Sequence, residues 1–369
     1  MSLTTDRTGT ADGPHLFRPL TIRSVTLPNR IVLSPMCQYC AVDGRPDDWH
    51  FQHLASRAVG GAGLVFTEAT HVEARGRITQ GCLGLYDEAQ RDALARIASF
   101  VKTQGVVPGI QLGHAGRKAS AQVPWRGGKA LTADDEPWAT VAPSAIAYDD
   151  GWHVPDELDT AGIAAVLAAF AKAVRMAREA GFEVVELHAA HGYLGHQFLS
   201  PLSNRRHDGY GGSAEGRMRF LHELVDAARR EWPTSLPLFV RLSVTDWVEG
   251  GFDEDQAIAV VSSLAERGDV DLVDCSSGGL HPRQRIAAFP GYQVPFAERI
   301  RQATGMMTGA VGMIQSPHQA EQIVATGAAD LVFMARTLLA DPYWPQRAAK
   351  ALGAARTWPA NMGRGDAFA

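Results

Sequence analysis

The chain has 369 residues, of which 46% are hydrophobic and 20% charged, a composition typical of a protein with a large buried core. Its formal net charge is −5 and no long run of one sign occurs, so nucleic acid is not expected as a partner. No apolar stretch approaches the roughly 18 residues of a membrane span. Residues 1–13 lack the apolar core of a signal peptide. We therefore expect a cytoplasmic protein without a membrane partner and with a flexible N-terminal tail over residues 1–13.

Four cysteines, at positions 37, 40, 82 and 275, are too few for a disulfide framework. Cys37 and Cys40 form a C-x-x-C motif, which leaves a thioredoxin-like dithiol open as an alternative. The motif lacks the second cysteine pair that a zinc or iron–sulfur site would need. No helix start follows it directly, which disfavours the thioredoxin interpretation.

Short apolar stretches alternate with amphipathic ones along the chain. In chain order, the expected strands lie at residues 30–33, 63–68, 105–111, 181–188, 236–241, 268–276, 305–309 and 327–334. Six of them begin at a glycine, a residue that ends a preceding helix well because it adopts a left-handed backbone without strain. Near-continuous apolar strands of this kind are typical of a parallel sheet that is buried on both faces.

Eight strands that alternate with helices predict an α/β fold, a (β/α)8 TIM barrel over residues 14–357. A doubly wound open sheet is the competing architecture, although no G-x-G-x-x-G motif follows any expected strand. Residues 120–156 interrupt the alternation with many Pro, Gly and Trp residues. A loop of this length is usually a lid or a binding segment, so we expect a lid-like insertion after the third strand. Residues 358–369 form a C-terminal tail.

Polar side chains follow the expected strands at their carboxyl ends, where ligands bind in such barrels. The apolar run that begins at Val184 ends at His188 and His191, with Tyr193 two residues further on. Two imidazoles and a phenol at one strand end can donate hydrogen bonds to one substrate oxygen and move one proton. The other strand ends contribute Ser34, Pro35, Met36, Cys37, Tyr39, Ala69, Gln111, Arg241, Ser277, Gly312, Ala335 and Arg336. The last two strands end in glycine-containing loops, which suit a phosphate site.

The two histidines also allow other interpretations. With His114 as a third ligand they could bind zinc, as in a metal-dependent barrel hydrolase. They could equally be hydrogen-bonded structural histidines. Because the strand ends carry no carboxylate pair and no serine beside a base, we favour donors that act on a substrate, and we expect no metal.

Several long motifs of the chain resemble those of the old yellow enzyme family of flavin-dependent ene-reductases, in particular its thermophilic-like bacterial subclass. The similar stretches are Asn29-Arg30-Ile31 through Tyr39, Gly76-Arg77-Ile78-Thr79, Gln111-Leu112-Gly113-His114-Ala115-Gly116-Arg117-Lys118, Ala142-Pro143-Ser144-Ala145-Ile146, His188 to Tyr193, Leu202-Ser203-Asn204-Arg205, Tyr210-Gly211-Gly212-Ser213 and Gly309 to Ile314. The resemblance runs from about Phe17 to Trp358 in the family's order.

The resemblance implies a barrel that binds FMN at its mouth and uses NADPH, or NADH, as reductant. It places Pro35, Met36, Cys37 and Ala69 along the flavin ring, Gln111 at the pyrimidine edge, Arg241 near N1, and Gly312, Ala335 and Arg336 at the phosphate, with Ser34 and Ser277 also among the cofactor-binding residues. The cysteine at position 37 is typical of the subclass, in which it tunes the flavin's potential.

For catalysis, the resemblance implies an ene-reductase with NADPH dehydrogenase activity. His188 and His191 would bind the carbonyl oxygen of an α,β-unsaturated substrate or a related nitro compound, with a further contact from Tyr39. Tyr193 would donate the proton, and Cys37 would act beside the flavin. A flavin-binding redox sensor that uses Cys37 without turnover is the alternative.

Two positions depart from the family pattern. Ala335 stands where the family usually has glycine, so a methyl group adjoins the phosphate loop. Near the C-terminus, Met362-Gly363-Arg364 keeps only the arginine of the subclass motif. The resemblance implies a homodimer or homotetramer in which Arg364 reaches the substrate site of the neighbouring subunit.

Overall fold

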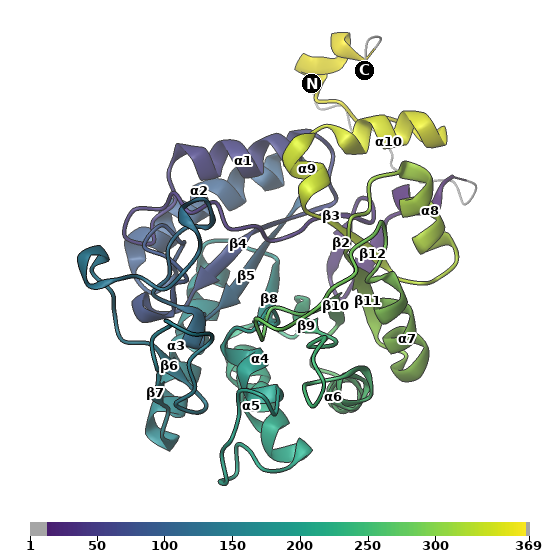
Figure 1. Ribbon diagram of the computed structural model, residues 1–369. Helices are drawn as coiled ribbons and strands as arrows, with labels where there is room; N and C mark the ends of the chain where they lie inside the picture. Colours follow the sequence, from purple (N-terminus) through teal and green to yellow (C-terminus); the bar gives the residue numbers. More distant parts are fainter. Residues whose placement is uncertain (1–12, 367–369) are drawn as a thin grey trace.

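The computed structural model describes residues 13–366, so the predicted flexible tail lies outside the described residues except for Gly13. Eight parallel strands close into a barrel in the order β10-β11-β12-β3-β4-β5-β8-β9 (Figure 1). Their bounds are β3 Ile31–Leu33, β4 Leu64–His71, β5 Val107–Gly113, β8 Val184–Ala189, β9 Leu238–Ser243, β10 Leu272–Ser276, β11 Met307–Ala310 and β12 Leu331–Met334. Each overlaps one expected strand. The predicted (β/α)8 barrel is confirmed, and the open sheet is wrong.

The helices surround the barrel. They are α1 Asp48–Val59, α2 Glu88–Thr103, α3 Thr160–Glu179, α4 Leu194–Leu199, α5 Ala214–Glu231, α6 Glu254–Arg267, α7 Val294–Thr304, α8 Pro317–Ala325, α9 Arg336–Ala340 and α10 Trp344–Leu352. Side-chain caps fix several starts: Ser213 accepts from the Gly216 N–H and Asp253 from the Gln256 N–H. Gly268 ends α6 in a left-handed conformation (φ 70°), as its position after an amphipathic segment predicts.

A short antiparallel hairpin, β1 (Leu20–Ile22) and β2 (Val25–Leu27), precedes the barrel and is not among the expected strands. Its apolar residues Ile22, Val25 and Leu27 are buried against barrel residues such as Val32 and Leu64. These barrel positions lie near the amino ends of their strands. The hairpin therefore covers the amino end of the barrel and leaves the carboxyl end open for a site.

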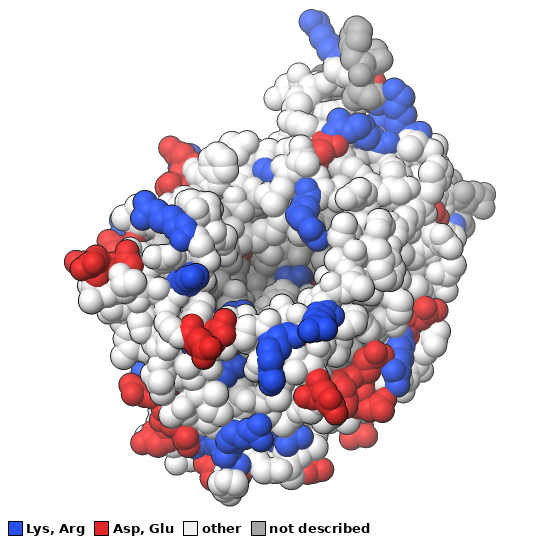
Figure 2. Space-filling view, in the orientation of Figure 1, with Lys and Arg blue, Asp and Glu red and all other residues white. Residues whose placement is uncertain are grey.

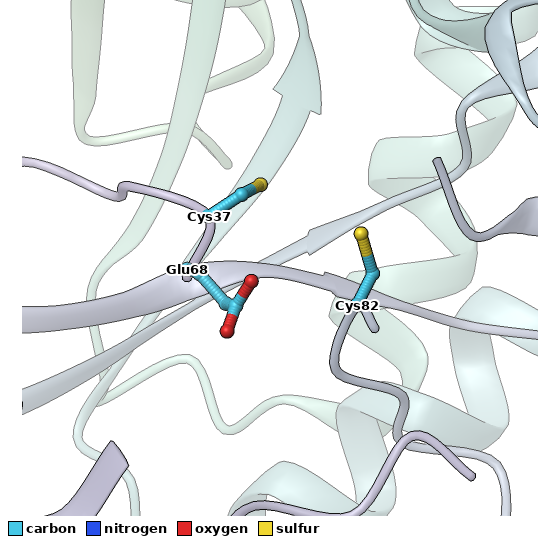
Figure 3. Close-up of side chains that lie close together, drawn as sticks. All are labelled: Cys37, Glu68 and Cys82. Atoms are coloured by element: carbon cyan, nitrogen blue, oxygen red, sulfur yellow. The ribbon is translucent and has the colours of Figure 1, made fainter. Parts of the chain in front are cut away.

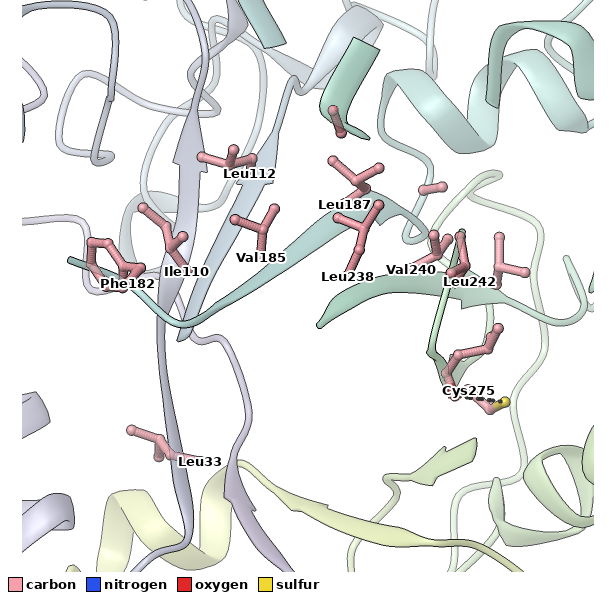
Figure 4. Close-up of a cluster of buried hydrophobic side chains, with 14 of the residues drawn as sticks. Leu33, Ile110, Leu112, Phe182, Val185, Leu187, Leu238, Val240, Leu242 and Cys275 are labelled. Carbon is pink, nitrogen blue, oxygen red and sulfur yellow. Dashed lines mark hydrogen bonds between the residues drawn. The ribbon is translucent and has the colours of Figure 1, made fainter. Parts of the chain in front are cut away.

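Side chains alternate along the strands between an apolar outer layer and the barrel interior, which is polar near the carboxyl ends of the strands. Val185 and Leu187 of β8 belong to the large core under the helices, together with Ile110 and Leu112 of β5 (Figure 4). The intervening residues point to the opposite side of the sheet. For this reason buried polar residues alternate with the core residues near the carboxyl ends of the strands, namely Gln111, Glu186, His188, Arg241 and Asp274.

Below these polar residues the barrel interior is filled by aromatic rings. Phe66 lies 6.1 Å from Phe333 and 6.2 Å from Phe239, measured between ring centroids. Gly109 makes room for this packing, since a Cβ atom there would lie 2.7 Å from the Phe66 ring. A Cβ atom at Gly309 would lie 2.3 Å from the Phe333 ring. The absence of a side chain at these two glycines therefore leaves space for the large rings of the neighbouring strands.

The insertion after β5 contains three short 3-10 helices and a two-stranded sheet, whose bounds are Gly116–Lys118, Pro124–Arg126, Ala133–Asp135, β6 Val141–Ala142 and β7 Asp156–Glu157. It lies beside the barrel mouth, because the Trp125 ring packs edge-on against Tyr39 at 5.8 Å. The Trp138 indole N–H also donates to the Arg75 carbonyl. The insertion thus occupies the predicted lid position.

Helix α3 is long and apolar enough to cross a membrane by length and composition alone. The expectation that no segment approaches a membrane span is therefore wrong for this helix. Its buried residues, among them Ile163, Val166 and Phe170, belong to the barrel core, and α3 packs against α5 and β5. The helix is apolar because it is Ala-rich and covers the barrel.

Candidate active site

The two predicted histidines and the tyrosine meet at the carboxyl end of β8. His188 is the penultimate residue of β8. Its ring lies 5.1 Å from the His191 ring and 5.0 Å from the Tyr193 ring, and the three rings are nearly perpendicular to one another. His191 has a left-handed backbone (φ 58°), which turns its side chain back towards the mouth. Tyr193 occupies the position directly before the short helix α4, without a capping hydrogen bond from its side chain. Figure 2 shows a hollow in this face of the molecule, with Lys and Arg side chains around it.

Both imidazoles are held neutral. Burial, and after it the charge of Arg241, lowers the pKa of His188 and of His191 well below the ordinary value for imidazole. The Ala190 N–H donates to Nδ1 of His188 at 3.2 Å, which assigns the ring proton to Nε2. Burial raises the pKa of Tyr193 well above its ordinary value. The site therefore presents neutral hydrogen-bond donors together with a protonated phenol.

His191 is fixed by contacts that sequence patterns did not indicate. Its Nε2 lies 2.7 Å from the Ser276 hydroxyl, and its backbone N–H donates to the Ser243 hydroxyl. Lys118 donates to the carbonyls of His191 (2.9 Å) and Gly279 (2.7 Å) and lies over the Tyr193 ring. Burial lowers the pKa of Lys118 to about 7. Lys118 is part of a matching motif, but its role depends on carbonyls that are distant in sequence.

The zinc interpretation does not agree with the geometry. His114 Nε2 lies 2.8 Å from a Glu73 carboxylate oxygen, and its Nδ1 accepts from the Gly116 N–H. Both ring nitrogens are therefore already engaged. Within residues 13–366, the groups of ligand-type side chains close enough to share an ion are Cys37–Glu68–Cys82 and Cys40–Asp47–His50. Neither contains the predicted histidine ligands.

The C-x-x-C motif does not begin a helix. Tyr39, between its two cysteines, has a left-handed backbone (φ 58°), and the next helix begins only at Asp48. Cys40 Sγ lies 3.7 Å from Nε2 of His50. The thioredoxin-like interpretation therefore lacks the helix that it requires.

A network of charged and polar side chains lies at the centre of the mouth. Gln111 donates to Glu186 at 2.7 Å, and Arg241 forms a 2.9 Å ion pair with Asp274. All four side chains are buried. Burial, and then the charge of Asp274, raises the pKa of Glu186 to about 8. Gln111 and Arg241 thus combine an amide with a fixed cation, a donor set that suits the polar edge of a flavin ring.

Substitution of Glu186 is expected to change the pH dependence of stability. Between the ordinary pKa of 4.5 and the folded value of about 8, the folded chain keeps a proton that the unfolded chain has lost. The stability from this group is therefore complete below pH 4.5 and is lost as the pH rises towards 8. Glu186→Gln never ionises, so urea unfolding of the flavin-free protein should depend less on pH across this window. Glu183→Gln, on the half-exposed pair with Lys102, is the control and should retain the wild-type slope.

A cavity of about 220 Å³ lies at the ends of β11 and β12. Gly312, Ala335 and Arg336 line it, and Arg336 is the first residue of the short helix α9. Gly312 has φ 134°, and a Cβ atom there would lie 3.2 Å from the Gln293 nitrogen. Ser277, on the adjacent strand end, donates to Gln293 at 2.6 Å. A cation beside backbone N–H groups in a pocket of this size suits a phosphate group.

The remaining predicted cofactor residues lie on neighbouring strand ends. Ser34 directly follows β3, and its buried hydroxyl has no hydrogen-bond partner among residues 13–366. Pro35, Met36 and Cys37 continue from it, and Ala69 pairs with Gln111 across β4 and β5. A buried hydroxyl without a partner is costly, and a bound ring with polar edges would satisfy it. The residues present therefore fit FMN.

The C-terminal residues do not join this site within one chain. The Trp358 ring packs on Tyr343 at 5.7 Å, and Arg364 is exposed in the 3-10 helix Ala360–Gly365, which projects away from the barrel (Figure 1). A larger cavity of about 850 Å³ lies between this segment and the amino end of the barrel, lined by Phe17, Asn29 and Trp358 among others. None of the predicted site residues lines this cavity.

Comparison with known proteins agrees with the geometry. Residues 15–354 match the profile of the NADH:flavin oxidoreductase / NADH oxidase family. The chain is 48% identical over 340 residues to an NADPH dehydrogenase of Geobacillus sp. (strain WCH70), covering 92% of this chain and 94% of that protein. It is 46% identical to an NADPH dehydrogenase of Bacillus subtilis (strain 168), over 95% of this chain and 98% of that protein.

Solved structures resemble the chain as well. Morphinone reductase aligns with a TM-score of 0.76 at 29% identity, over 94% of this chain and 92% of that one. A 2-naphthoyl-CoA reductase aligns with a TM-score of 0.83 at 27% identity, over 91% of this chain and 52% of that one.

Proposed function

Because the chain belongs to the NADH:flavin oxidoreductase / NADH oxidase family, as an FMN-dependent oxidoreductase of the old yellow enzyme type, we propose that it is an ene-reductase. It would reduce the C=C bond of α,β-unsaturated carbonyl compounds and of related nitro compounds at the expense of NADPH. The observation that carries this proposal is the convergence of two neutral imidazoles and a protonated phenol at one strand end.

FMN, when bound, supplies a hydride acceptor for the nicotinamide and a hydride donor for the substrate. The chain's own residues bind the ring edge through Gln111 and Arg241 and the phosphate through Arg336. His188 and His191 donate hydrogen bonds to the substrate's oxygen, where negative charge develops during reduction. Their low pKa matters here, because a neutral imidazole fixed by Ser276 can donate without transferring its proton.

Tyr193 is the proposed proton donor to the substrate's α-carbon. Its phenol stays protonated at neutral pH because burial raises its pKa, and the Lys118 ammonium lies 5.1 Å from its ring centroid. The fraction of Lys118 that is protonated, which burial reduces by lowering its pKa to about 7, stabilises the phenolate that remains after proton transfer. Tyr39 contributes a second phenol near the substrate, in contact with Trp125 of the insertion.

Tyr193→Phe should slow enone reduction by about 10²-fold, the lower end of what general acid catalysis contributes. The same variant should oxidise NADPH with ferricyanide at the wild-type rate, because that acceptor needs no proton on carbon. Steady-state assays with both acceptors, and product analysis for the saturated ketone, test this assignment. An equal loss with both acceptors would mean that Tyr193 only supports the fold of the site.

A redox sensor without turnover remains the second candidate, since Cys37 follows the flavin-facing segment. The two functions separate in one experiment. A sensor consumes NADPH no faster when 2-cyclohexenone is added, whereas an ene-reductase consumes one NADPH for each enone reduced.

Because the four cysteines are free thiols, as is usual in a reducing compartment, we also propose that the enzyme acts in the cytoplasm.

We further propose a homodimer or homotetramer in which the C-terminal segment reaches a partner's site. Arg364 is exposed, the 3-10 helix that carries it projects away from the barrel (Figure 1), and large aromatic residues such as Trp358 favour interfaces. Truncation after Arg356 should then lower the oligomeric state in light scattering and raise the enone KM at unchanged flavin content. Arg364→Ala, the matched variant, should raise KM without dissociation. Unaltered scattering and kinetics in both variants would leave the segment with no role in assembly.

A further inference from the structure

Two cysteines from distant parts of the sequence lie together beside the mouth. The sulfurs of Cys37 and Cys82 and a carboxylate oxygen of Glu68 all lie within 4.8 Å of one another, and Figure 3 shows the two thiols on facing segments above Glu68. Cys37 follows β3 and is half-buried, whereas Cys82 is fully buried in the loop after β4.

The backbones that carry these cysteines are in direct contact. The Ala41 N–H donates to the Gly81 carbonyl at 2.9 Å, and a Cβ atom at Gly81 would lie 2.4 Å from the Tyr39 carbonyl oxygen. Thr79 holds the second sulfur, because its backbone N–H donates to Cys82 Sγ at 3.4 Å. The two sulfurs lie within 4.8 Å of one another, whereas a disulfide bond is about 2.05 Å long, so the two cysteines must move towards each other for the bond to form.

We propose that Cys37 and Cys82 form a reversible oxidative modification site, a dithiol that a hydroperoxide converts into a disulfide. The Cys37 sulfur attacks the terminal oxygen of the hydroperoxide, the O–O bond breaks, and water or an alcohol leaves with a proton. The Cys82 sulfur then displaces the hydroxyl group from Cys37, so that an S–S bond forms and water leaves. The two thiols lose two electrons and two protons, which the hydroperoxide accepts.

Cys82 is a better partner for Cys37 than Cys40 is, although Cys40 is nearer in sequence. The Cys40 sulfur lies beside His50. The Glu68 carboxylate, which lies beside Cys37 and Cys82, accepts a hydrogen bond from the Gln38 N–H at 3.1 Å. Its other oxygen lies 3.1 Å from Nε2 of His50, the neighbour of Cys40. A hydrogen bond with Cys82, together with burial, raises the pKa of the Cys37 thiol well above its usual value. The resting pair is therefore a neutral dithiol that reacts slowly and needs sustained oxidant.

The disulfide would act on the site just described. Cys82 belongs to a buried apolar cluster with Ile78 and Ala115, against which Cys37, Tyr39 and Tyr193 pack. A cavity of about 320 Å³ borders the segment from Thr79 to Gly81, which gives this loop room to adjust. Drawing Cys37 towards Cys82 would shift it from the flavin-facing position. This consequence rests on the proposed function, whereas formation of the disulfide does not.

The test treats the flavin-loaded enzyme with hydrogen peroxide, alkylates the remaining thiols and maps them by mass spectrometry. In the wild type we expect a peptide pair joined through Cys37 and Cys82, loss of two of the four thiols, and enone reduction that falls with the cross-linked fraction. Dithiothreitol should restore both. Cys82→Ser, which reduces enones normally before oxidation, should form no link and lose Cys37 irreversibly. Cys275→Ser, in the core of β10, should behave like the wild type.

A Cys37–Cys40 link, or intact Cys37 and Cys82 thiols after prolonged oxidation, would overturn the proposal. So would a Cys82→Ser enzyme that recovers with dithiothreitol as fully as the wild type. If Cys82→Ser folds poorly, as its flavin content would reveal, Cys82→Ala gives the same comparison. The thiol map requires no enone turnover, so a protein that is not an ene-reductase would still reveal whether the pair oxidises.

Discussion

His188→Ala and His191→Ala are each expected to slow enone reduction by about 10²–10³-fold, because each removes one donor to a developing oxyanion, an effect worth about 2.7–4 kcal/mol. Reduction of the bound flavin by NADPH should change far less, since no oxyanion forms in that half of the reaction. Stopped-flow absorbance at the flavin band measures the two halves separately.

Two control variants make this experiment specific. His191→Asn retains an N–H donor and should recover part of the lost rate. His222 of α5, whose Nε2 lies 2.9 Å from the Ser263 hydroxyl, is remote from the mouth, so His222→Ala should reduce enones normally. Equal loss in both halves of the reaction, without rescue by asparagine, would mean that the histidine pair only maintains the structure of the site.

Arg336→Ala is expected to weaken FMN binding by roughly 10- to 150-fold, as follows from the 1.5–3 kcal/mol that a hydrogen bond to a charged group contributes. The guanidinium lines the phosphate-sized cavity beside Gly312, and it can bind two phosphate oxygens at once. Titration of the flavin-free protein with FMN, followed by fluorescence, measures the dissociation constant. Riboflavin, which lacks the phosphate, should bind the variant and the wild type equally.

Arg336→Lys keeps the charge but loses the planar pair of donors, so its affinity for FMN should be intermediate. Arg299 of α7 forms exposed ion pairs with Glu254 and Asp255, and Arg299→Ala serves as the control with wild-type affinity. If Arg336→Ala binds FMN as tightly as Arg299→Ala does, the phosphate lies elsewhere and the assignment of the cavity is wrong.

Most of the barrel could be predicted from local patterns. Apolar runs after glycines, such as the one from Gly181 to His188, locate strands because a sheet buried on both faces requires continuous apolar residues. The hairpin of β1 and β2 escaped prediction because each strand has three residues with an exposed threonine in the middle, so neither forms an apolar run like that of the equally short β3. Its burial depends on the amino end of a barrel that exists only after folding.

Site residues could be predicted where they stand at the end of an expected strand. They could not be predicted where their role depends on contacts with residues distant in the sequence. His188 and Gln111 are signalled by position alone. Glu186 and Asp274 also carried a signal, since each is an acid between two apolar residues of an expected strand, which places it inside the barrel. Lys118 lies in a stretch that resembles the family, but its contact with the His191 carbonyl, 73 residues away, could not be predicted from it. Cys82 carried no signal, because its partner Cys37 follows a different strand.

The most direct test of the ene-reductase assignment is an anaerobic two-step reaction of the purified protein. One equivalent of NADPH should bleach the bound FMN, and 2-cyclohexenone added afterwards should restore the oxidised spectrum while one equivalent of cyclohexanone forms. A flavin that NADPH reduces but that neither 2-cyclohexenone nor an α,β-unsaturated nitro compound reoxidises would contradict the assignment.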